Sequence, residues 1–183
     1  ATPEILFMNE LYKFPREVNG MTCKGLSKAL GVQVDVMLGM DVLRDLHLRI
    51  NPQHGVIQFS RRAFRSSGAR LPLKYPDGLP TTQLNIGGEN VSLRLVTALK
   101  LNYLPSQILT GLNQVDTASD SLLAGSGFST PVYEVPIALG HHVLSLNFGV
   151  VPDDLRISLG LGAGEGVLGT DFLHNAPITL AFP

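Results

Sequence analysis

The sequence predicts a mostly β protein made of short strands and tight turns. Its 183 residues include 19 Gly and 12 Pro but no Trp, and turn signals separate many short apolar runs. This combination favours strands and turns over long helices. Hydrophobic residues make up 44% of the chain and charged residues 16%, which predicts a packed core rather than disorder. We expect one substantial domain or two small ones.

The composition also limits the classes of function. The formal net charge is −1, so nothing draws the whole chain towards nucleic acid or acidic membranes. No apolar run approaches the ~20 residues that span a bilayer. The single Cys23 excludes an internal disulfide and a multi-cysteine metal site, and the His residues show no chelating spacing. We predict a soluble protein, with a preference for the cytoplasm, that has no metal, cofactor, nucleic-acid or membrane partner.

An internal repeat organises the chain. VDVMLGMDVL (34–43) and EGVLGTDFL (165–173) share the frame apolar-Leu-Gly-x-Asp-apolar-Leu, with Gly39 and Gly169 at equivalent places. Thr2-Pro3 and Thr130-Pro131 recur at nearly the same interval as these glycines. Two copies of one supersecondary unit explain this interval better than a solenoid, whose repeats are shorter. The repeat predicts that residues 2–59 and 130–182 superpose, with Gly39 and Gly169 in like surroundings.

The first copy is expected to end in a short helix and two strands. Asp41 follows Leu-Gly directly, where it can cap a helix that carries Val42 and Leu43. HLRI and VIQF, within residues 47–59, are predicted strands joined by the turn NPQHG. Small and basic residues then follow without periodicity, and they predict an exposed linker over 61–77 rather than a nucleic-acid patch.

A hairpin comes next, in LPTTQLNIGGENVSLRLVTALKLNYLP (79–105). Its turn is Ile86-Gly87-Gly88, and its second arm alternates apolar and polar residues, as a half-buried strand does. The inward positions are Val91, Leu93 and Leu95. The arm ends at Val96-Thr97-Ala98, three residues with almost no chemistry.

The second copy contains a predicted hairpin over 132–150, a helix after its own Leu-Gly pair, and a terminal strand in 177–182. GLGAGEG (160–166) lacks the spacing of a phosphate loop and predicts a flexible loop before a strand. His141-His142 predicts an exposed turn. Asp171 repeats the position of Asp41. The two carboxylates could form an acid–base couple, but helix capping explains both.

These residues together resemble the retropepsin-like aspartic proteases. The Leu-Gly motifs are similar to the segment that closes the catalytic loop in that family, and the Ile-Gly-Gly hairpin is similar to the one that leads to its Asp-Thr/Ser-Gly-Ala. The resemblance covers 78–183 as a complete unit and 1–60 as the late half of another. It implies an acid-protease fold of one complete unit plus a partial second unit, and it places the catalytic Asp at Val96, the Thr at Thr97 and the Gly at Ala98.

The resemblance implies a protease fold without its acid, because Val96 neither ionises nor forms a side-chain hydrogen bond. A pseudoprotease that binds a protein or peptide, or that dimerises, is the expected function. The alternative is an active aspartic endopeptidase that uses Asp116, in VDTASD (115–120), or an Asp from a missing segment or partner chain. Asp116 is expected in a polar turn, and Val96 is expected to be buried beside the Leu-Gly motif of its own unit.

The order of the halves leaves a further choice open. The first copy has no early hairpin of its own, so either an upstream segment carries that half or the copy has become a structural partner. We expect an intramolecular pseudo-dimer or a homodimer, because a single retropepsin unit needs a second one to close its cleft.

Overall fold

The computed structural model describes residues 4–17, 22–65, 68–121, 127–174 and 177–182. Strands dominate these residues, which confirms the predicted mostly β class. The chain divides into two compact units, Ala1–Gly39 and Met40–Pro183. The late half expected over 1–60 is therefore divided between the two units, and the predicted limits at 60 and 77 stay predictions.

The unit Ala1–Gly39 contains a short hairpin and one helix. The hairpin pairs β1 (Glu4–Phe7) with β2 (Glu10–Lys13), and Met8 and Asn9 turn the chain with positive φ angles of 51° and 66°. Helix α1 (Cys23–Leu30) begins where the Thr22 side chain accepts a 3.0 Å hydrogen bond from the Gly25 amide. It ends at Gly31, in the left-handed conformation.

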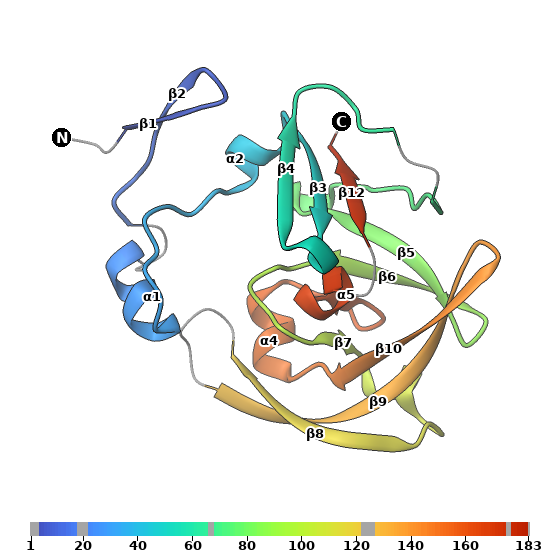
Figure 1. Cartoon of the computed structure of the whole chain (residues 1–183). Helices are drawn as coiled ribbons and strands as arrows, with labels where there is room; N and C mark the ends of the chain where they lie inside the picture. Colours follow the sequence, from blue (N-terminus) through green and yellow to red (C-terminus); the bar gives the residue numbers. More distant parts are fainter. Residues whose placement is uncertain (1–3, 18–21, 66–67, 122–126, 175–176, 183) are drawn as a thin grey trace. The chain divides into compact units, whose positions relative to one another are not determined.

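The unit Met40–Pro183 is built around a six-stranded barrel. Its strands follow the order β10, β7, β11, β6, β5 and β9. β9 pairs with β10 to close the ring, and these two strands lie side by side in Figure 1. A further strand, β8 (Gln114–Ser121), extends the sheet beyond β9. The bounds of the barrel strands are β5 (Thr81–Ile86), β6 (Glu89–Leu95), β7 (Asn102–Leu104), β9 (Gly127–Leu139), β10 (His142–Val150) and β11 (Gly166–Leu168).

The β5–β6 hairpin forms as its sequence predicts. Gly87 and Gly88 take positive φ angles of 61° and 90° in the turn, a conformation that side chains with a Cβ disfavour. Val91 and Leu93 are buried in the barrel core, while Leu95 is half-buried at the end of the strand. The predicted second-copy hairpin is also confirmed, as β9 and β10.

A second, three-stranded sheet contains the last strands of both copies of the repeat. The terminal strand β12 (Ile178–Ala181) pairs antiparallel with β3 (His47–Asn51), which in turn pairs with β4 (Val56–Ser60) (Figure 1). Both predicted Leu-Gly helices are present, as α2 (Met40–Leu43) and α5 (Thr170–His174). Asp41 and Asp171 are the second residues of these helices, not the caps that we expected. There they complement the partial positive charge of the first turn.

The remaining helical turns lie in connections. Two are α-helices and two are 3₁₀ helices, namely α3 (Ser106–Leu109), α4 (Asp153–Ser158), η1 (Pro52–His54) and η2 (Pro76–Gly78). The described residues of the 61–77 linker that carry the arginines are exposed, as predicted.

The repeat is visible in the order of elements. A hairpin, a helix, an extended segment, the Leu-Gly pair, a short helix and a strand follow one another from β1 to β3 and again from β9 to β12. The prediction of like glycine surroundings is wrong, because Gly39 is exposed whereas Gly169 is buried. The reason is that strands β6 and β7 enclose the second motif. Thr2-Pro3 lies outside the described residues.

Candidate functional site

Val96 lies where β6 leaves the barrel, beside the Leu-Gly motif of its own unit. Its amide donates a 2.9 Å hydrogen bond to the Leu168 carbonyl, and its own carbonyl accepts a 3.2 Å bond from the Leu99 amide. The second bond closes a turn over 96–99, in which Thr97 is exposed and Ala98 half-buried. Val96 thus lies beside the Leu-Gly motif of its own unit, as we expected. The predicted burial is wrong, because Val96 is half-buried at the rim of the cluster around Leu99.

Gly169 passes directly under the loop that carries Val96. A Cβ at this position would collide with the Leu101 carbonyl and would lie 2.9 Å from the Leu99 oxygen. The Gly169 amide donates a 3.0 Å hydrogen bond to the Asn102 side chain. The next amide, of Thr170, donates to the Leu99 carbonyl at 2.9 Å. The Leu-Gly motif and the loop are therefore joined by hydrogen bonds and packed so closely that no side chain fits at position 169.

Asp120 supplies the loop with a carboxylate that sequence reasoning missed. From β8, its Oδ2 accepts hydrogen bonds from the Lys100 amide at 3.1 Å, the Leu101 amide at 3.0 Å and the Tyr103 hydroxyl at 2.7 Å. Its Oδ1 accepts from the Ser121 amide at 2.8 Å. The Asp120 carboxylate therefore accepts hydrogen bonds that fix the position of the loop. No motif or periodicity in the sequence relates Asp120 to this earlier loop.

Tyr103 is fully buried at the centre of this arrangement. Burial raises the pKa of its hydroxyl well above the ordinary value, and the hydrogen bond to Asp120 and the negative charges of Asp120 and Asp171 raise it further. The hydroxyl therefore stays protonated and acts as a donor, so it stabilises the loop instead of serving as a base.

Asp116 occupies an exposed position in β8, so its predicted place in a polar turn is wrong. The alternating pattern that marks strands is absent there because both faces of β8 near Asp116 are exposed. A register shift, typical of a β-bulge, separates Gln114 from Asp116. The Asp116 Oδ1 accepts a 2.7 Å hydrogen bond from the Thr117 amide.

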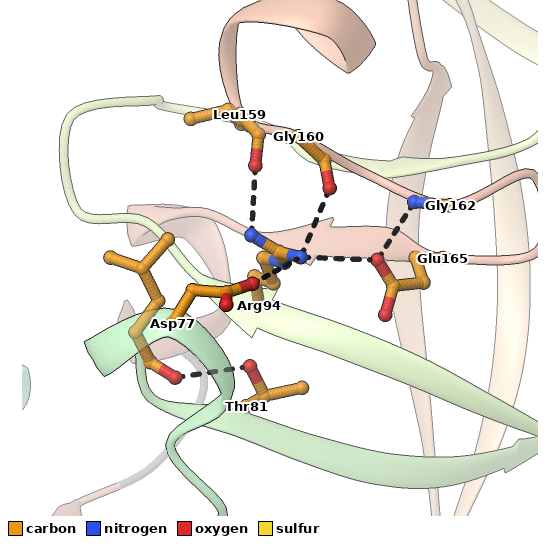
Figure 2. Close-up of polar contacts among 8 residues, drawn as sticks. Asp77, Thr81, Arg94, Leu159, Gly160, Gly162 and Glu165 are labelled. Carbon is orange, nitrogen blue, oxygen red and sulfur yellow. Dashed lines mark hydrogen bonds and ion pairs between the residues drawn. The ribbon is translucent and has the colours of Figure 1, made fainter.

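Arg94 is the second residue that sequence reasoning missed. Although it lies on a barrel strand, its side chain is only 7% exposed and forks onto the 159–165 loop (Figure 2). Nη1 donates to the Leu159 carbonyl at 2.8 Å and Nη2 to the Gly160 carbonyl at 3.1 Å. Nη2 also contacts Glu165 Oε2 at 3.4 Å.

Arg94 binds the loop that was expected, from GLGAGEG (160–166), to precede a strand. Glu165 Oε2 also accepts a 2.8 Å hydrogen bond from the Gly162 amide, which folds the loop on itself (Figure 2). Strand β11 begins directly afterwards, at Gly166. Arg94 and Glu165 therefore position β11, and through it the Leu168-Gly169 pair that contacts Val96.

An apolar cavity of about 390 Å³ lies beside the C-terminal ends of β6 and β11. Leu95 and Leu168 line one part of it, and Phe172, Ile178 and Leu180 line another. No Asp or Glu is among its described lining residues. The cavity can hold apolar groups, and its described lining offers no pair of carboxylates for acid–base chemistry.

Comparison with protein-family models finds no match to this chain, and comparison with curated proteins finds none either. In the part of the chain that the structure describes, no three His, Cys, Asp or Glu residues gather as a metal site would require. Within that same part, no helix is both long and apolar enough to cross a membrane.

Proposed function

We propose that this chain is a catalytically inactive retropepsin-like domain that binds a peptide by strand addition. The observation that carries the proposal is the place of Val96. It stands at the end of the hairpin strand and is hydrogen-bonded to the Leu-Gly motif, which is where the family resemblance puts the catalytic acid.

The chemistry of the position supports inactivity. Aspartic proteases hold two carboxylates about 3 Å apart, which share a proton so that one can activate water. Val96 and Ala98 offer no ionisable group, and the nearby carboxylate of Asp120 is occupied by hydrogen bonds from the loop. An apolar residue also avoids the cost of an unpaired carboxylate in a half-buried site.

The rival function, an active aspartic endopeptidase, would use Asp116 or an Asp from another segment or chain. A catalytic Asp should sit at the base of a cleft and face a second carboxylate. Asp116 is instead exposed on β8, and its side chain binds the amide of its own neighbour. This position favours the non-catalytic function.

Association of the two late halves within one chain supports an intramolecular pseudo-dimer over a homodimer. Strand β12, from the second copy, pairs antiparallel with β3, from the first, in a register that sets Ile178 opposite Ile50. If a two-fold axis relates the two copies, equivalent strands that pair across this axis must be antiparallel, as β3 and β12 are.

The edge of β8 is the proposed place of strand addition. Within the described part of the chain, β8 pairs with one strand, β9, so its other edge presents backbone groups without a strand partner there. Thr117 lies opposite Pro131, which has no amide hydrogen. Thr117, Ser119 and Ser121 therefore direct their own amides to the free edge. The side chains of Asp116 and Asp120 cover the amides of Thr117 and Ser121, which leaves the Ser119 amide for a peptide.

We expect Ser119→Pro to weaken peptide binding about tenfold, because it removes the outward amide and one or two hydrogen bonds of about 1 kcal/mol each. The probe is a library of random decapeptides. Peptides retained by the unmodified chain are identified by mass spectrometry, and their affinities are then measured by calorimetry.

Ser119→Ala is the matched control. It removes the hydroxyl that lies 3.1 Å from the Ser129 hydroxyl but keeps the amide, so affinity should stay within about twofold. Equal affinities for the proline variant and the unmodified chain, with both folded by circular dichroism, would exclude β8 as the binding edge.

A further inference from the structure

Large apolar side chains are unusually exposed in the unit Ala1–Gly39. A small folded unit normally buries much of its large apolar side chains, so several exposed ones in one unit are consistent with contact to another chain segment. The residues and their exposed fractions are Leu6 (69%), Leu11 (60%), Leu30 (57%), Val32 (60%) and Val36 (37%).

The segment 33–39 follows α1 and has no strand partner in the described part of the chain. The repeat identifies its counterpart in the second copy. Val36, Met37 and Leu38 precede Gly39 as β11 precedes Gly169. In the first copy Val36 is exposed and the two residues after it are half-buried.

The second copy shows what covers a segment of this kind. β11 lies between two strands, parallel to β6 and antiparallel to β7. Between them Val167 is 0% exposed and Leu168 is 1% exposed. Both neighbours belong to the early half of the unit, the hairpin and short strand within 81–104.

We infer that residues 33–39 are a docking strand for a second early half, a pair of strands of the β6 and β7 kind, supplied by another polypeptide segment. The occupant would lie on both sides of 33–39 and cover the exposed side chain of Val36. This inference depends on the repeat and not on the peptide-binding function of β8.

A second copy of this chain is excluded as the occupant by two observations. Its own β6 and β7 already hold its own β11. The counterpart of Val36 is Gly166, where a Cβ would collide with the Tyr103 carbonyl and lie 2.7 Å from Leu93 Cδ2. The strands that accept Val36 must therefore leave room that β6 and β7 do not have.

Hydrogen exchange tests the inference on the full chain. An extra copy of residues 78–105 is fused ahead of residue 1 through a flexible Gly/Ser linker, which gives it a high effective concentration. Val36→Gly is introduced to provide the space that these particular strands need. We expect amide exchange in 33–39 to slow at least tenfold relative to the Val36→Gly chain without the fusion.

The control is the same fusion with Leu93→Lys and Leu104→Lys in the added copy only, which should leave exchange in 33–39 fast. Unchanged exchange in β9 and β10 shows in each case that the barrel is folded. Equal exchange rates in 33–39 with and without the fusion would overturn the inference. So would slowing in the unfused chain that grows with its concentration, because the occupant would then be a second copy.

Discussion

Gly169→Ala should lower the free energy of unfolding of the barrel unit by about 3 kcal/mol, at the upper end of the cost of overpacking. The added methyl would collide with the backbone carbonyl of Leu101 and lie 2.9 Å from that of Leu99. A backbone oxygen cannot rotate away as a side chain can. The loop must move, and the hydrogen bonds that join it to Thr170 and Asp171 lengthen or break.

Urea unfolding followed by circular dichroism measures this loss. Gly164→Ala is the matched control, because a Cβ there meets nothing within 4 Å and the residue is exposed. Its effect should stay within about 0.5 kcal/mol. Similar losses for the two variants would contradict the close approach of motif and loop.

Arg94→Met should cost about 3 kcal/mol, because it leaves the Leu159 and Gly160 carbonyls without their donors and removes the cation next to Glu165. Methionine keeps much of the side-chain volume, so lost packing contributes little. Arg94→Lys should lose an intermediate amount, since an ammonium cannot fork onto two carbonyls.

Asp77→Asn is the control for charge alone. The Asp77 carboxylate lies 3.9 Å from Arg94 and is 82% exposed, so its removal should change stability by less than about 0.5 kcal/mol. Thermal unfolding of the four proteins gives the comparison. A loss for Asp77→Asn as large as that for Arg94→Met would show that general charge, and not the fork onto the loop, holds β11 in place.

The parts of the fold that follow from local sequence were predictable. Alternation in 89–95 reflects a strand with one buried face, and Gly87-Gly88 reflects a turn that needs positive φ. The Asp and apolar residues that directly follow each Leu-Gly pair likewise predicted α2 and α5, and short apolar runs predicted the strands after them. Each of these signals arises within a few residues of the element it specifies.

The features that join distant segments were not predictable in this way. Arg94 binds carbonyls of a loop that follows much later in the chain, and Asp120 binds a loop that precedes its own strand. Neither contact leaves a mark in periodicity. Gly39 and Gly169 share a motif but differ in burial, because burial depends on neighbouring strands that only the second copy has. The polar neighbours of Asp116 favoured a turn. Such residues are equally common on an exposed edge strand, so composition alone does not distinguish the two.

A cleavage assay tests whether the site at Val96 has catalytic activity. The purified chain and its Asp116→Ala variant are incubated with a mixed peptide library between pH 4 and 7, and the products are identified by mass spectrometry. We predict that every peptide stays intact with both proteins, because no paired carboxylates are available to activate water. Cleavage by the unmodified chain that disappears in Asp116→Ala would contradict the claim and identify an active aspartic endopeptidase.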